Sequence, residues 1–207
     1  MTEYTTIAAP CEGSITEKRS EFIAQLFPAG TEDECREIIE TVKAKHHKAR
    51  HNVWAYILRE PAATRYSDDG EPQGTGGQPV LGVLQKSCLT DVCCVVTRYF
   101  GGVLLGAPGL TRAYSGAAAE SVNAAKLLRF KESHRIRLET DYSFYGTLSH
   151  MLPQYGIKDA GSDFSDKVTL LFDIPAAEYP AMEAALTELY NGKPAITLLE
   201  THFVCYE

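Results

Sequence analysis

The sequence of 207 residues predicts an α+β fold in two domains, residues 1–136 and 137–207. Two observations lead to this prediction. Strand-like and helix-like segments are mixed along the first two thirds of the chain. The last part, about 70 residues long, follows the order β-α-β-β-α-β of a ferredoxin-like domain. The chain is long enough for two such domains, each with its own apolar core.

The first domain opens with strands that lead into a helix. Residues 14–29 alternate between apolar and polar side chains, which is typical of β-structure. Thr31 and Glu34 have the spacing of a capping box, and the apolar stripe that follows predicts a helix over residues 31–49. Residues 52–58, NVWAYIL, are rich in aromatic and β-branched side chains and predict a strand.

Three further elements complete this domain. The pattern predicts a helix over residues 80–89, a buried central strand over residues 91–100 and an alanine-rich helix over residues 109–128. The last two are joined by a glycine-rich segment that predicts tight turns or the close approach of another backbone. Its glycines are Gly101, Gly102, Gly106 and Gly109.

The second domain shows six elements in order. They are a strand over residues 133–146, a helix over 145–155, two hairpin strands over 157–164 and 167–175, a helix over 177–190 and a strand over 195–206.

The charge is distributed unevenly. The net charge is -7, and the chain from Arg137 onward holds four Lys and Arg against eleven Asp and Glu, so all the excess acid lies in the second domain. We expect this acidic domain to steer orientation or to bind a basic protein. In the neutral first domain, residues 43–51 form a basic cluster that could contact phosphate or could be a solvated helix end. Its candidate nucleic-acid contacts are Lys43, Lys45, Lys48 and Arg50.

The location of the protein is predicted from what the sequence does not contain. No apolar run has transmembrane length, and the first twenty residues resemble neither a secretory signal nor a transit peptide. The six cysteines are scattered and form no C-x-x-C pair, which favours reduced thiols. We expect a cytoplasmic protein without membrane contact.

An acidic loop, YSDDGEPQGTGGQP at residues 66–79, allows several interpretations. Asp68, Asp69 and Glu71 offer hard oxygen ligands for Mg²⁺, but Asp and Gly are also ordinary turn residues. A phosphate could instead bind where glycines lead into the helix at residues 106–119, near Arg112. The loop matches neither phosphate-binding glycine motif, and no catalytic triad or zinc pattern occurs. We therefore predict no catalytic residue, metal or cofactor.

Four segments taken together are more specific than any one motif. SEFIA at residues 20–24, HHKARHNVWAY at 46–56, SDDGEPQGTGGQP at 67–79 and VVTRYFGGVLLGAPGLTRAYSGA at 95–117 closely resemble the IMPACT family, whose bacterial members are called YigZ. The acidic second domain is similar to the extra domain of bacterial members, which resembles parts of elongation factor G.

This resemblance implies a fold and a function. The first domain would be a two-layer α/β domain similar to the second domain of a small-subunit ribosomal protein and to domain four of elongation factor G. The family is associated with control of translation. We therefore expect a regulatory or binding protein that contacts the ribosome, RNA or a translation factor. The alternative is a Mg²⁺-dependent enzyme that acts on a nucleotide or phosphorylated small molecule through the acidic loop and the glycine-rich helix start.

The family motif also suggests where a ligand or partner binds. We expect the three carboxylates of the acidic loop to face Arg98 across a cleft floored by the glycines of residues 101–109. The candidate ligand-binding or partner-binding residues are His51, Asp68, Asp69, Glu71, Thr75, Arg98, Tyr99, Gly101, Gly102, Gly106, Gly109, Arg112 and Tyr114.

Overall fold

The structure is a computed structural model and describes residues 2–206. Contacts divide the chain into two compact units, residues 4–128 and residues 129–206 together with Thr2 and Glu3. The division falls shortly before the predicted boundary at residue 136. Strand β7 (Leu127–Thr140) continues without interruption through both positions, so no turn marks a boundary at 136.

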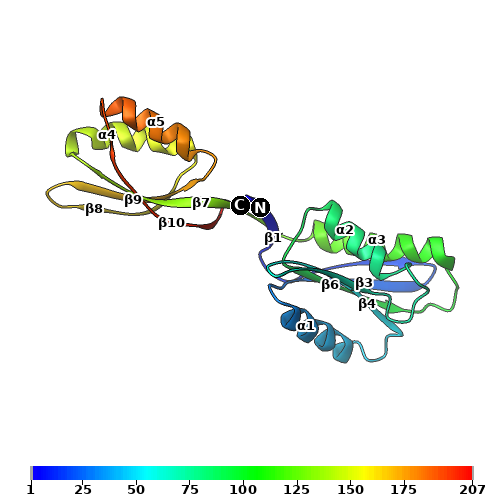
Figure 1. Cartoon of the computed structure of the whole chain (residues 1–207). Coiled ribbons are helices and arrows are strands. Elements are labelled where there is room, and N and C mark those ends of the chain that lie inside the picture. The colour runs from blue at the N-terminus through cyan, green and yellow to red at the C-terminus, as the bar shows by residue number, and fades with distance from the viewer. Residues whose placement is uncertain (1, 207) are drawn as a thin grey trace. The chain divides into compact units, whose positions relative to one another are not determined.

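The first unit is built around a five-stranded antiparallel sheet with the strand order β2-β3-β6-β4-β5. Helix α1 covers one face, and α2 and α3 cover the other (Figure 1). The elements in chain order are β1 (Glu3–Ile7), β2 (Cys11–Glu17), β3 (Ser20–Pro28), α1 (Glu32–Lys45), β4 (His51–Arg59), β5 (Ala62–Ser67), α2 (Gly77–Lys86), β6 (Val92–Tyr99) and α3 (Gly106–Asn123).

Strand β6 is the central strand of this sheet, as the sequence predicts. Seven of its eight residues are buried because both faces of the sheet are covered. Successive side chains point to opposite faces. Cys94 therefore packs in the core under α2 and α3, while its neighbour Cys93 packs in the core under α1.

The predicted ends of both helices on the other face were wrong. Helix α2 begins at Gly77 and not at residue 80, because the Asp68 carboxylate accepts hydrogen bonds from the amides at the start of the helix. Helix α3 begins at Gly106 and ends at Asn123. Residues 127 and 128 belong to β7, which pairs with β1.

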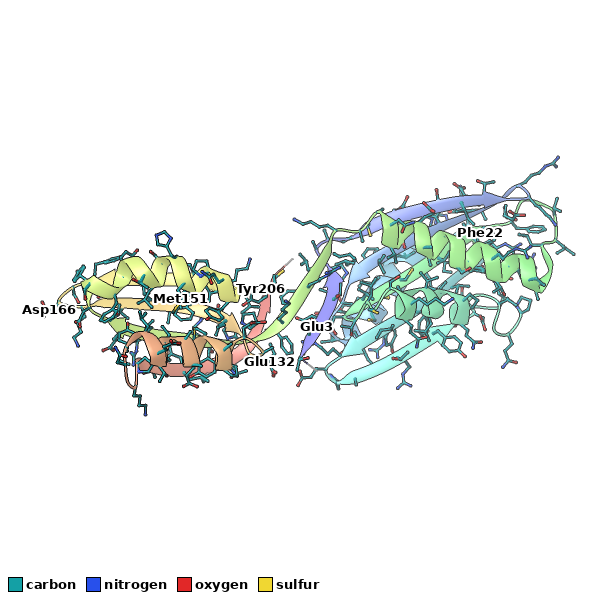
Figure 2. All side chains as sticks on the ribbon, turned by 90° about the horizontal axis from the view of Figure 1, so that it is seen from above. Glu3, Phe22, Glu132, Met151, Asp166 and Tyr206 are labelled. Atoms are coloured by element: carbon teal, nitrogen blue, oxygen red, sulfur yellow. The ribbon has the colours of Figure 1, made fainter. Side chains whose placement is uncertain are left out.

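The second unit has the predicted ferredoxin-like arrangement. Its antiparallel strands lie in the order β10-β7-β9-β8, and α4 and α5 cover one face of the sheet (Figure 1). In Figure 2 the side chains of each core fill the space between helices and strands. The elements after β7 are α4 (Tyr142–Met151), a 3-10 helix (Leu152–Tyr155), β8 (Lys158–Phe164), β9 (Val168–Pro175), α5 (Tyr179–Leu189) and β10 (Ala195–Cys205).

Two element ends in this unit also differ from the sequence prediction, and the first of them is that α4 begins at Tyr142 and not at residue 145. The first strand, predicted to run to residue 146, ends at Thr140 because α4 begins at Tyr142.

Among residues 2–206, no helix combines the length and the apolar composition needed to cross a membrane.

Candidate functional site

The motif residues gather at one end of the sheet of the first unit. Arg98, near the end of β6, lies opposite His51 at the start of β4 and opposite Phe22 near the start of β3. The turn between β2 and β3, the segment before β4 and the segment after β6 therefore lie at the same end of the sheet.

A buried polar network lies beneath this end. Arg98 Nη1 donates to Glu71 Oε1 at 2.6 Å, and the Tyr114 hydroxyl donates to the same oxygen at 2.8 Å. His51 Nε2 lies 4.0 Å from this oxygen. The side chains of Arg98 and Glu71 are only 7% and 4% exposed, so the ion pair is largely removed from water.

The surroundings of Tyr114 and Arg98 support their part in this network. Burial, followed by the nearby Glu71 carboxylate, raises the pKa of Tyr114, so its phenol remains a neutral hydrogen-bond donor. The guanidinium carbon of Arg98 lies 5.4 Å from the ring centroids of both Phe22 and Phe100. Cation–π attraction therefore adds to the ion pair.

The other two carboxylates of the acidic loop do not face Arg98, so this part of the expected arrangement was wrong. Asp68 accepts from the amides of Gly74, Gly76 and Gly77 at 2.8, 2.9 and 2.8 Å. Asp69 accepts from the Asn52 amide at 2.7 Å and forms an ion pair with Lys43 at 3.4 Å. Both carboxylates bind the protein's own groups, because a turn rich in glycine leaves backbone amides to be satisfied.

This bonding leaves the Mg²⁺ interpretation without support. Both oxygens of Asp68 already accept hydrogen bonds. Within residues 2–206, no group of three or more His, Cys, Asp or Glu side chains is arranged to hold a metal ion.

The glycines differ in what they do. A Cβ on Gly101 would overlap the backbone of Arg19, so this glycine admits the protein's own turn between β2 and β3 and not a ligand. Gly102 and Gly106 have φ of +82° and +72° and face open space. Gly109 is buried in α3 beside Leu105.

Replacing Gly101 with alanine is expected to lower the free energy of unfolding by about 1–3 kcal/mol, because the new methyl group overlaps backbone that cannot move aside easily. Urea denaturation measures the loss. Gly82→Ala, in α2 with open space around it, is the matched control and should be neutral or stabilising by up to about 1 kcal/mol. Equal stability of Gly101→Ala and the wild type would contradict this packing role.

The loop after β6 exposes three apolar side chains that the sequence analysis did not select. Phe100 is 44% exposed, Val103 40% and Leu104 83%. The run FGGVLLG indicates this exposure, because its large apolar residues are flanked by glycines, which have no side chain to cover them. Arg112 is exposed in α3 shortly after this loop.

The basic cluster splits into two parts. Lys45, Lys48 and Arg50 are exposed and free to meet a partner, while Lys43 is half-buried and paired with Asp69. His46, within the same segment, is buried, and its Nδ1 lies 3.0 Å from the Tyr99 hydroxyl. Burial, helped by Lys45, lowers the pKa of His46, so it remains neutral and does not add to the cationic surface.

Thr75 has a local role only. Its hydroxyl donates to the Pro72 carbonyl at 2.7 Å inside the acidic loop. Five of the candidate residues are buried below the surface, namely Glu71, Thr75, Arg98, Gly109 and Tyr114. A partner at this end would meet the exposed residues of the loop after β6 and of the basic segment.

Comparisons with known proteins match both units. The family model described as the Impact N-terminal domain matches residues 18–122, and a domain of unknown function, DUF1949, matches residues 138–193. IMPACT family member YvyE of Bacillus subtilis is 37% identical over 93% of this chain and 89% of its own. IMPACT family member YigZ of Escherichia coli is 30% identical over 97% of this chain and 100% of its own. A solved structure described as that of a hypothetical protein is 30% identical, with a TM-score of 0.61 over 97% of this chain and 98% of that one.

Proposed function

Since the chain belongs to the IMPACT family, we propose that it is a cytoplasmic regulatory protein that binds the translation machinery through the ribosome, RNA or a translation factor. The family's association with control of translation supports this assignment. The observation that carries it is the loop after β6, residues 100–105, which holds three exposed apolar side chains above a buried polar network.

The loop is anchored at its start and exposed at its tip. Phe100 lies over the Arg98 guanidinium, and the Gly101 amide donates to Ser20 Oγ at 3.1 Å. Beyond these anchors, Leu104 is the most exposed large apolar side chain among the described residues. Exposed apolar side chains that are held in place, and not left on a free terminus, are typical of contact sites for a partner.

Cations at the same end of the sheet complement this apolar tip. Lys48 and Arg50 precede β4 and are exposed, as are Lys18 and Arg19 in the turn between β2 and β3. Ribosomal surfaces and RNA carry phosphate, which such cations attract in a salt-dependent way. The buried network then acts by positioning the loop and not by touching the partner.

Replacing Leu104 with aspartate is expected to weaken association with ribosomes by about tenfold or more, since the change removes an exposed apolar contact and places an anion facing phosphate. Co-sedimentation with purified ribosomes at low and raised salt measures the effect. The wild type should lose binding steeply as salt rises.

Leu199→Asp is the matched control, because Leu199 is 45% exposed in the second unit, in β10. Both variants should keep the melting temperature of the wild type, as exposed substitutions have small effects on folding. If Leu104→Asp binds ribosomes as tightly as Leu199→Asp, the loop is not the contact surface and the proposal fails.

A further inference from the structure

The sheet of the second unit has a face that its own helices do not cover. Ile136 and Leu138 of β7 pack with Met182 and Leu186 of α5 in the core. Because side chains alternate along a strand, the odd-numbered residues of β7 point to the opposite face. The burial pattern of β7 shows this alternation, with residues 129, 131, 137 and 139 exposed.

This uncovered face collects cations in a unit that is otherwise acidic. Strand β7 contributes Arg129, Lys131, Arg135 and Arg137, and the register of β8 against β9 adds Lys158 opposite Asp173. These five are the majority of the seven Lys and Arg in residues 129–206. The register places four acids on the same face, namely Glu139, Asp163, Asp173 and Glu200.

The acids near the centre of the face are already neutralised. Arg135 binds the buried Asp173 carboxylate through two hydrogen bonds of 2.9 and 3.0 Å, and it reaches Glu200 at 3.2 Å. Glu139 and Asp163 both lie opposite Thr169, in one row toward the far end of β7. The end of the face near residues 129–131 is left cationic.

At that end two lysines converge on one aromatic ring. The ammonium of Lys131 lies 5.7 Å from the ring centroid of Tyr206, and that of Lys158 lies 5.6 Å from it. Tyr206 is fixed by a hydrogen bond from its amide to the Arg129 carbonyl and by a 3.2 Å contact between its hydroxyl and Ser133 Oγ. Figure 2 shows Tyr206 just beyond the end of β10. In residues 2–206, neither lysine forms an ion pair with a carboxylate.

We propose that this uncovered face, centred on Lys131, Lys158 and Tyr206, binds the phosphodiester backbone of single-stranded RNA. Arg135 and Arg137 are paired with Asp173, Glu200 and Glu139. The two ammoniums beside the Tyr206 ring and the nearby Arg129 on the same strand form a cationic track of the kind that follows a nucleic-acid backbone. The uncovered face of strands β10, β7, β9 and β8 is also a surface on which single-stranded RNA can lie flat.

The proposal goes beyond the expectation that the acidic domain steers orientation or binds a basic protein. Only four of the acids of this unit lie on the uncovered sheet face, which carries five cations. The site lies in the second unit and uses none of the residues of the loop after β6. It therefore does not rest on the function proposed above.

The test measures the affinity of the full chain for a fluorescein-labelled oligouridine by fluorescence anisotropy over a series of salt concentrations. Lys131→Glu/Lys158→Glu should weaken binding at least about tenfold and reduce the slope of log affinity against log salt by about 1.4, the value for two lost phosphate contacts on a single strand. The matched control is Lys167→Glu/Lys193→Glu. It makes the same change in net charge at exposed lysines in the turns before β9 and before β10.

The outcomes separate a local site from general charge. A loss confined to the first double variant supports the proposal, and so does retention of affinity in Lys131→Arg/Lys158→Arg. Equal losses in both glutamate variants, or none in either, would overturn it. Competition by inorganic polyphosphate as effective as that by unlabelled oligouridine would assign the face to polyanions in general and overturn RNA. Lys131→Glu/Lys158→Glu changes no residue of the loop after β6, and Leu104→Asp changes none of the sheet face, so failure at one surface is distinguishable from failure at the other.

Discussion

Replacing Glu71 with alanine is expected to lower the free energy of unfolding by about 3–5 kcal/mol, the usual range when one partner of a buried ion pair is removed. The carboxylate accepts from Arg98 at 2.6 Å and from Tyr114 at 2.8 Å, and its side chain is 4% exposed. Without it, a guanidinium and a phenol remain buried and lack their acceptor. A loss of this size is a large fraction of the stability of a domain, and urea denaturation measures it.

Two further variants show whether the effect comes from the pair. Removing both charges in Glu71→Ala/Arg98→Met should destabilise less than the sum of the single changes, because no unpaired charge is left. Glu71→Gln, which keeps an oxygen acceptor, should lie between alanine and the wild type. A loss below about 1 kcal/mol in Glu71→Ala, together with abolished ribosome binding, would instead make the network a binding site.

The sequence identified the members of this network but not its nature. Family motif positions included Glu71, Arg98, His51 and Tyr114, and all four lie together. The motif did not reveal which of three neighbouring carboxylates meets Arg98. That choice depends on the path of the turn, in which Asp69 has φ of +44° and Gly70 has φ of +86°. Only Glu71 is thereby directed into the core beside Arg98.

Helix ends were missed where the cap comes from a distant position. Local rules look for a capping residue directly before the helix. The start of α2 is instead stabilised by Asp68, whose carboxylate reaches the amides of Gly76 and Gly77 from the far side of the loop. By contrast, the cap of α1 was found, because Thr31 accepts from the Glu34 amide at the predicted spacing.

The cationic face of the second unit was present in the sequence as a period of two. In LLRFKESHRIRLET, basic residues occupy positions 129, 131, 135 and 137. The strand was predicted to begin only at residue 133, so half of this alternation lay outside the predicted element. Net charge over the whole domain concealed the pattern as well, since it averages over both faces of a sheet.

Replacing Asp68 with alanine is expected to lower the free energy of unfolding by about 2–4 kcal/mol, combining the loss of a helix cap with the loss of charge-assisted hydrogen bonds. Three amides, those of Gly74, Gly76 and Gly77, would lose their acceptor. Gly76 and Gly77 are buried, so water cannot readily replace the carboxylate there. Asp68→Asn should be intermediate, because one oxygen still accepts while its new NH₂ group opposes a donor. Urea denaturation gives the three values.

The same variants decide between a structural turn and a magnesium site, because only a magnesium site predicts that added Mg²⁺ raises the melting temperature. Asp166→Ala, at an exposed aspartate in the second unit, is the control and should change stability by less than about 0.5 kcal/mol. If Asp68 serves only the loop amides, millimolar Mg²⁺ leaves the melting temperature of the wild type unchanged. A melting temperature that rises with Mg²⁺ in the wild type and not in Asp68→Ala would mean that the metal binds the folded state through this carboxylate. The loop would then have to break hydrogen bonds of the Asp68 carboxylate to bind Mg²⁺. Asp68 would become a metal ligand, as the enzyme interpretation requires.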